Sequence, residues 1–315
     1  MISDDSHFQF DNMVAIIGPV FKLVENYSKI VLHECLLFAN DRKDTRKVKM
    51  AIELRIFSIR ESTLAQQTIW QENFEVRSHE TDFALRWKPA AIFRVMEEIT
   101  VHHSFHLGVD YYSLKEMNLA WILVRTKVRF YEFPAVGTRI IVQTWPRGWQ
   151  QKIFGMRDYS LANEKGKSVA HATTAWLLVN TKTRRFVKPE VLTVALPDNE
   201  GKFILDETLD KLTHPTGFSK EHVYQARYSS LDLMGHVNNT QYIDWLCDCF
   251  PVSFWRKYQF EWLQINYSNE VKPEESINIE MTELADQPGV FSAVATNLTS
   301  HLTAFEAQFG FKQAG

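Results

Sequence analysis

Two side chains capable of acid–base chemistry, Asp232 and His236, stand four residues apart in the stretch Asp-Leu-Met-Gly-His-Val-Asn-Asn. These polar, turn-forming residues run directly into an apolar segment with helical spacing, which predicts a helix from about Val237 to Cys249. Both side chains are therefore expected at or just before a helix N-terminus. The unpaired backbone N–H groups of a helix start favour developing negative charge, so a carbonyl directed at them would be polarised and its oxyanion stabilised.

The residue types allow two interpretations of this stretch. In the functional one, Asp232 takes a proton from water or attacks the carbonyl directly, and His236 hydrogen-bonds the carboxylate or positions the substrate. In the plainer one, the stretch only caps a helix, because Asp, Asn and Gly are common before helices for structural reasons. The spacing leaves both interpretations open.

The elements around this stretch are predicted twice, in the same order. In the first copy, a strand over 70–77 precedes a helix that begins at Lys88-Pro89 and keeps one apolar face through Leu107. Four strands follow it, over 120–133, 138–146, 153–162 and 168–179. The second copy has a strand over 222–229, the helix over 237–249, and strands over 259–270, 277–284, 290–300 and 302–311. This order indicates a helix wrapped by an antiparallel sheet.

The repeat also divides the chain. A gapless shift of 150 residues aligns Asp82 with Asp232 but sets Arg86 opposite His236, so the first copy lacks the polar set of the second. The predicted divisions are an N-terminal extension without an assigned role, a first domain, a linker in which three prolines discourage regular structure, and a second domain. Their ranges are 1–67, 68–185, 186–220 and 221–315.

Composition narrows the possible classes. The 315 residues suit two domains, and 45% hydrophobic with 23% charged residues is typical of a soluble globular protein. A net charge of -3 gives no support for nucleic-acid binding. No apolar run reaches the roughly 20 residues of a membrane-spanning helix, and acidic residues precede any Lys or Arg, unlike a secretory signal. We therefore expect a cytoplasmic protein that does not insert into membranes.

Neither cysteines nor histidines indicate a metal site. The number of cysteines does not indicate a disulfide framework, and no two of them have the spacing of paired metal ligands. The three cysteines are Cys35, Cys247 and Cys249. A group of histidines on the first helix lacks Asp or Glu at ligand spacing and is interpreted as structural or interfacial; it consists of His102, His103 and His106. No metal and no cofactor are predicted.

The string from Asp232 to Asn239, followed by the aromatic Tyr242, resembles the signature of hotdog-fold thioesterases. A narrower resemblance, to the acyl-ACP thioesterase family, covers most of 68–311 and runs through both halves in order. It is carried in the first half by Trp121-Ile-Leu-Val-Arg125, Tyr131-Glu-Phe-Pro134, Thr144-Trp145, Arg157-Asp158, Trp176 and Asn180-Thr-Lys-Thr-Arg-Arg185.

This resemblance implies an α+β fold of two tandem hotdog domains, each a long helix wrapped by an antiparallel β-sheet, within the 4-hydroxybenzoyl-CoA thioesterase-like superfamily. It implies hydrolysis of the thioester of fatty acyl-ACP, releasing free fatty acid and ending chain elongation, with acyl carrier protein as partner. The active site is expected in the second domain, with Asp232, His236 and Glu270 as catalytic residues. Glu270, expected on the strand after the helix, has the chemistry of a general base for water.

Two positions depart from the plant members of the family. They carry Asn where this chain has Met234, and Cys where it has Val271, so a Cys nucleophile is excluded there. Asn238 is the residue expected to compensate for Met234, by stabilising the oxyanion or positioning the substrate.

The first domain is expected to hold the acyl chain and the carrier. The acyl pocket would be lined by Ile92, Met96, Ile99 and Trp121, although such a helix face is more often plain core. Because acyl carrier proteins are acidic, a basic cluster is expected to dock them, with a solvated loop as the alternative. That cluster consists of Lys182, Arg184 and Arg185.

Other functions stay open at this point. The same chemistry would serve an acyl-CoA thioesterase, and a non-catalytic acyl or acyl-carrier binding protein would also fit. Hotdog hydratases space their Asp and His five apart with Asn-Pro between, whereas here the gap between Asp232 and His236 is four and lacks proline. A homodimer is possible.

Overall fold

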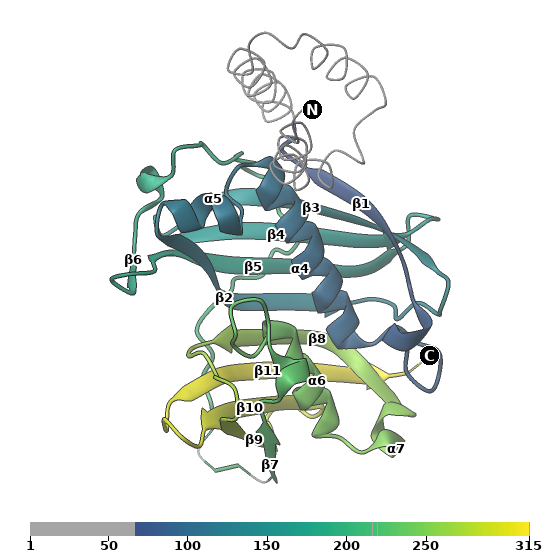
Figure 1. Ribbon diagram of the computed structural model, residues 1–315. Helices are drawn as coiled ribbons and strands as arrows, with labels where there is room; N and C mark the ends of the chain where they lie inside the picture. Colours follow the sequence, from purple (N-terminus) through teal and green to yellow (C-terminus); the bar gives the residue numbers. More distant parts are fainter. Residues whose placement is uncertain (1–66, 216, 219, 315) are drawn as a thin grey trace, which may run out of the picture. The chain divides into compact units, whose positions relative to one another are not determined.

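The computed structural model describes residues 67–314 except 216 and 219 (Figure 1). Nearly all of the predicted N-terminal extension, and with it Cys35, lies outside the described residues. We call residues 67–215 the first half and residues 220–314 the second half.

The first half contains one long helix and five long strands, as predicted. Its helices are α4 (Pro89–His106) and the short α5 (Tyr111–Glu116), with 3-10 turns at Ser78–Glu80 and Pro189–Val191. Its strands are β1 (Trp70–Glu75), β2 (Leu119–Phe130), β3 (Arg139–Gln150), β4 (Phe154–Asn163), β5 (Ser168–Asn180) and β6 (Arg185–Phe186). The sequence did not predict α5, which is too short for periodicity and begins at the side-chain cap of Asp110.

The second half repeats this order with shorter elements. A 3-10 turn at Tyr228–Ser230 precedes α6 (Asn239–Asp248) and the one-turn α7 (Val252–Trp255). The strands are β7 (Lys220–Gln225), β8 (Tyr258–Tyr267), β9 (Ser276–Glu283), β10 (Val290–Asn297) and β11 (Thr303–Gln313).

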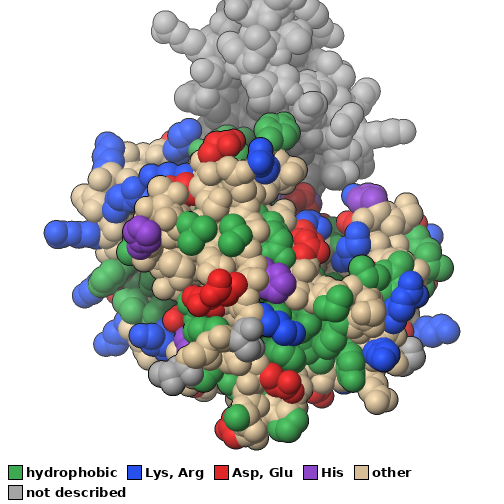
Figure 2. Space-filling model, turned by 90° about the horizontal axis from the view of Figure 1, so that it is seen from below, with side chains coloured by type: hydrophobic (Ala, Val, Ile, Leu, Met, Phe, Trp, Pro, Cys, Tyr) green, Lys and Arg blue, Asp and Glu red, His purple; other side chains and the backbone are tan. Residues whose placement is uncertain are grey.

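All long strands belong to one antiparallel sheet, in the order β1-β3-β4-β5-β2-β8-β11-β10-β9-β7 (Figure 1). The order within the first half is the mirror of that in the second, and the halves meet where β2 pairs with β8, from Arg125↔Asn266 to Arg129↔Trp262. At the sheet edge, β7 carries Lys220 and Glu221, and charges on an edge strand discourage further pairing. Figure 2 shows this end of the molecule, where acidic, basic and apolar side chains are interspersed.

The helices α4 and α6 lie on the same face of the sheet (Figure 1). They contact each other, and Arg94 of α4 forms an ion pair with Asp244 of α6. One apolar core extends under both helices and across the β2–β8 junction, where the rings of Phe130 and Phe260 stack with centroids 6.0 Å apart. Burying an Ile or Leu side chain stabilises a fold by about 1.5–3 kcal/mol, so this shared core holds the two halves together.

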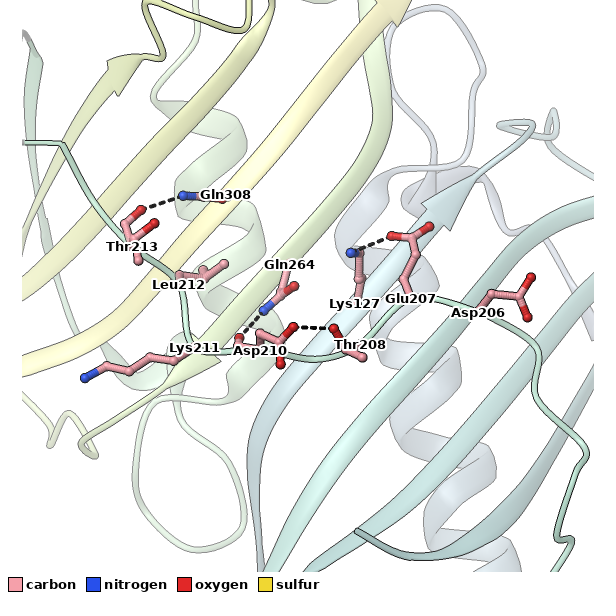
Figure 3. Close-up of a pocket in the computed structure, with 10 residues that line it drawn as sticks. All are labelled: Lys127, Asp206, Glu207, Thr208, Asp210, Lys211, Leu212, Thr213, Gln264 and Gln308. Carbon is pink, nitrogen blue, oxygen red and sulfur yellow. Dashed lines mark hydrogen bonds and ion pairs between the residues drawn. The ribbon is translucent and has the colours of Figure 1, made fainter. Parts of the chain in front are cut away.

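The linker crosses the opposite face of the sheet (Figure 3). The buried carboxylate of Asp158 accepts the N–H of Ile204 at 3.0 Å, and Gln264 donates to the carbonyl of Asp210 at 2.8 Å. A hollow of about 540 Å³ lies here, lined partly by Lys127, Glu207 and Lys211. Because it is on the face away from α4 and α6, it is separate from the Asp232 region.

Several predicted boundaries were wrong, and one matters for function. The strand expected over 259–270 ends at Tyr267, so Glu270 lies in the following loop rather than on a strand. The ladder stops because the N–H groups of Ser268 and Asn269 share the single carbonyl of Ala304. The first half does the same: the strand expected over 120–133 ends at Phe130.

No helix among the described residues is long and apolar enough to cross a membrane. Within the same part of the chain, no three His, Cys, Asp or Glu side chains gather where a metal could bind. His102 does have carboxylate partners, Glu72 and Glu98. Glu98 lies one helical turn before His102, so the expectation that no acid stands near the histidines was wrong, whereas Glu72 is 30 residues away in the sequence. The neighbour of His102, His103, is buried and accepts a hydrogen bond from Arg157, in keeping with a structural role.

Candidate active site

The stretch from Asp232 to His236 forms a compact turn closed by its own aspartate. Oδ1 of Asp232 accepts the N–H groups of Met234 at 2.8 Å and His236 at 3.2 Å, while the Asp232 N–H donates to the His236 carbonyl at 2.8 Å. Gly235 has a φ of +79°, which a glycine adopts without steric cost. This turn places both Asp232 and His236 directly before α6, as predicted.

The helix starts two residues later than predicted, because Asn238 is its N-cap. Oδ1 of Asn238 accepts the N–H of Thr240 at 2.7 Å and the hydroxyl of Thr240 at 2.6 Å. Capping satisfies one of the four N–H groups that a helix start leaves unpaired. The remaining N–H groups keep the partial positive charge on which the predicted oxyanion stabilisation depends.

Glu270 approaches the turn from the loop after β8. The N–H of Val237 donates to the carbonyl of Val271 at 2.9 Å, which holds the loop beside the turn. Oε2 of Glu270 then lies 3.6 Å from Nε2 of His236. The three residues predicted as catalytic are thus brought together, although Glu270 reaches the site from a loop.

Arg184 also reaches this site. Its guanidinium donates to Oε2 of Glu270 at 3.0 Å, although 77% of its side chain is exposed. The sequence placed Arg184 in a carrier-docking cluster with Lys182 and Arg185, and both of these are exposed beside it. The basic cluster predicted to dock the carrier therefore borders the candidate active site directly.

Glu97, on α4 of the first half, is a site residue that the sequence did not identify. The amide nitrogen of Asn238 donates to its two carboxylate oxygens at 3.0 and 3.2 Å. Part of the Glu97 side chain faces solvent, yet protein atoms crowd its carboxylate, and this burial raises its pKa; the negative charge of Asp232 raises it further. In the sequence, Glu97 is one of two adjacent acids on a polar helix face, and nothing there distinguishes it.

Tyrosines lie beneath these acids. Burial raises the pKa of Tyr242 on α6, and the charges of Asp232 and Glu270 add to the effect. Burial also raises the pKa of Tyr267 on β8, with a smaller contribution from Glu97. Both tyrosines are therefore neutral at physiological pH and can act only as hydrogen-bonding groups.

The cysteines of α6 are unsuited to nucleophilic chemistry. Burial raises the pKa of Cys247 well above its ordinary value and that of Cys249 to about 12. Only a thiolate is a strong nucleophile, so these thiols are inert at neutral pH. With the thiols excluded, the nucleophiles that the candidate site can supply are water activated by a carboxylate and the carboxylate of Asp232 itself.

The residues predicted for the acyl pocket fall into two groups. Ile92, Met96 and Ile99 of α4 are buried in the main core. Trp121 of β2 instead packs against a second apolar cluster, to which Leu114 of α5 belongs, and contacts Trp149 with ring centroids 5.9 Å apart. The structure does not bring Trp121 together with the three α4 residues, and the pocket stays a prediction.

Comparisons with known proteins cover both halves. The acyl-ACP thioesterase N-terminal domain matches residues 67–193, and the acyl-ACP thioesterase C-terminal domain matches residues 213–308. An oleoyl-acyl carrier protein thioesterase of Arabidopsis thaliana is 23% identical over 272 residues, which are 80% of this chain and 73% of the relative. A palmitoyl-acyl carrier protein thioesterase of Gossypium hirsutum is 27% identical over 232 residues, covering 69% and 55%.

Solved structures share the fold. A 12:0-ACP thioesterase from Umbellularia californica superposes with a TM-score of 0.69 at 19% identity, over 79% of this chain and 99% of that one. An acyl-ACP thioesterase from Bacteroides thetaiotaomicron gives 0.64 at 20% identity, over 78% and 99%. The predicted α+β fold of two tandem hotdog domains is confirmed. Both halves match in order and over most of the chain, and the protein therefore belongs to the acyl-ACP thioesterase family of thioester hydrolases.

Proposed function

We propose that this enzyme releases free fatty acid from acyl-ACP, ending chain elongation in fatty acid biosynthesis, at one active site per chain. The observation that carries the proposal is the meeting of Asp232, His236 and Glu270 at the start of α6. In this mechanism the carboxylate of Glu270 or Asp232 takes a proton from a water molecule. At the same time, the oxygen of that water bonds to the thioester carbon. Backbone N–H groups near the α6 start stabilise the oxyanion. The C–S bond then breaks, and the carrier's sulfur leaves with the proton as a thiol.

The carrier is bound beside this site by Lys182, Arg184 and Arg185. Acyl carrier proteins are acidic, and a basic surface attracts them and orients them on approach. The contact between Arg184 and Glu270 supports this role, because a carrier docked there would bring its acyl thioester to the carboxylates. The acyl chain would extend along α4, past Ile92, Met96 and Ile99.

The test is turnover and product identity. Expression of the full chain in a bacterial host should release free fatty acids, and their identification would give the preferred chain length. Asp232→Asn should abolish this release. Hydrolysis measured on matched acyl-ACP and acyl-CoA decides the carrier, and a clear preference for acyl-CoA would refute our assignment of the substrate.

We also propose that the protein acts in the cytoplasm. The named plant relatives are chloroplastic, so this proposed location differs from theirs. Imaging of a fluorescent fusion tests it. The possible homodimer stays a prediction, for which light scattering of the purified protein is the measurement.

A further inference from the structure

The second half does not complete the site without the first. The carboxamide of Asn238 has an accepting oxygen, Oδ1, and a donating nitrogen, Nδ2. Oδ1 accepts hydrogen bonds from the N–H and the hydroxyl of Thr240. Nδ2 therefore points the other way, to both oxygens of Glu97 on α4. Because a carboxylate only accepts hydrogen bonds and Oδ1 cannot donate, these contacts determine the orientation of the amide.

The position of Glu97 is set by packed helices rather than by a loop. One helical turn earlier on α4, Arg94 pairs with Asp244 of α6. Residues three apart on a helix lie on the same face, so the contacts of Arg94 and Glu97 join α4 to α6 at two successive points. A carboxylate held in this way has a defined distance to the start of α6.

The surroundings of Glu97 are more polar than a plain helix contact requires. The hydroxyls of Thr126 on β2 and Tyr267 on β8 are buried, and hydrogen bonding from Thr126 acts on the pKa of Tyr267, so the two hydroxyls are neighbours. Thr126 is only 1% exposed. Glu97 contributes to the raised pKa of Tyr267, so its carboxylate acts on this polar region.

We propose that Glu97 is a positioning residue of the active site, which holds the Asn238 carboxamide and thereby sets where α6 begins and where its N–H groups point. This inference rests on the proposed function, because those N–H groups are the ones assigned to the oxyanion. Glu97 does not touch the substrate in this role and acts through Asn238. The active site is then shared between the halves, with its catalytic residues in the second and this support in the first.

The first experiment compares Glu97→Ala, Glu97→Gln, Asn238→Ala and the double variant of the two alanines on acyl-ACP. Misplacing a group by about 1 Å can cost about 100-fold in rate, so we expect Glu97→Ala to lower kcat by about 10- to 100-fold with KM nearly unchanged. Glutamine can still accept from Nδ2 and should restore most of kcat. The double variant should be no slower than the slower single variant, because the two residues act as a unit. Glu98→Gln, an exposed neighbour paired with His102, is the matched control.

A second set keeps the inference testable if the alanine variants do not fold. Asn238→Asp retains a good N-cap oxygen but turns a carboxylate oxygen toward Glu97, so kcat should fall. Adding Glu97→Gln supplies an amide that can donate to the new Asp, and kcat should recover. Additive losses in the alanine pair, wild-type kcat in Glu97→Ala, or no recovery in the Asp–Gln pair would each overturn the inference. If Asp232→Asn is inactive while Glu97→Ala is normal, the proposed function stands and only this inference fails.

Discussion

The turn before α4 and the turn before α6 have nearly the same backbone but different chemistry. In the first half, Oδ1 of Asp82 accepts the N–H groups of Ala84 at 2.8 Å and Arg86 at 3.0 Å, as Asp232 does in the second. The Asp82 N–H also donates to the Arg86 carbonyl at 2.9 Å. The shared aspartate therefore closes a turn in both halves, and this role alone does not make it catalytic.

The side chains around the two aspartates differ. Arg86 donates to the second oxygen of Asp82 at 3.0 and 2.8 Å and also contacts the carbonyl of Trp255. No cation among the described residues closes Asp232 in this way, because His236 stands at the equivalent position and turns toward Glu270. Both oxygens of the first carboxylate are thus bound within their own turn, whereas the second turn binds only Oδ1 of Asp232.

The loop positions complete the comparison. Trp87 donates to the carbonyl of Pro134 at 2.8 Å, just as Val237 donates to Val271. Phe133 consequently occupies the place that Glu270 has in the second half, and Lys88 is the N-cap where Asn238 stands. The two repeats thus share a backbone and differ at three side chains, and only the second repeat has the set that we propose as catalytic.

The largest expected effect separates the two aspartates. Asp232→Asn keeps the oxygen that closes the turn but removes the charge, so kcat should fall roughly 1,000-fold or more. Asp82→Asn makes the same change in the first half and should leave kcat within about twofold, because Asp82 is not among the residues that we propose as catalytic. The measurement is kcat of both variants from steady-state kinetics on acyl-ACP. An equal loss in both variants would show that the turn, rather than the carboxylate, matters.

The next effect tests the loop position. Glu270→Gln should lower kcat about 100-fold with little change in KM, because the base that activates water is lost while binding is retained. Glu261→Gln, an exposed acid on the adjacent strand β8, is the control and should behave like wild type. Normal turnover in Glu270→Gln would remove that residue from the mechanism.

A smaller effect is expected at the docking cluster. Arg184→Gln should lower kcat/KM about 10-fold for acyl-ACP at low salt and much less for acyl-CoA, because it weakens attraction to an acidic carrier. Arg139, which is also exposed and pairs with Glu164, supplies the control Arg139→Gln. A similar loss on both substrates would indicate that Arg184 acts on Glu270 rather than on the carrier.

The smallest effect concerns stability in the first half. Burial lowers the pKa of His103 to about 3 from an ordinary value near 6.5. Below pH 6.5 the unfolded chain binds a proton at this position and the folded chain does not, so the free energy of unfolding should fall by up to about 1.4 kcal/mol per pH unit between pH 6.5 and 3. His103→Gln should show a shallower decline in urea unfolding between pH 7 and 5. An unchanged slope would mean that His103 is not buried as described.

Periodicity located the long elements well but failed at their ends. The helix predicted from Lys88 through Leu107 is observed at Pro89–His106, because its apolar face repeats over five turns. Strands β2 and β8 stop early where successive N–H groups share a carbonyl, and no residue type signals that bulge. Glu97 was missed because its partner is 141 residues away, and Glu72, the partner of His102, because it is 30 residues away.

Local chemistry along the chain was enough to place a polar turn before an apolar helix. The hydrogen bonds of Asp232 reach only two and four residues ahead, so the turn follows from the order of its own residues. Whether such a turn becomes an active site depends on long-range contacts, from Arg184 to Glu270 and from Asn238 to Glu97. These contacts require that β2 pairs with β8 and that α4 packs against α6. The register of that pairing is set by the apolar core that both halves share, and the residues of either turn do not encode it.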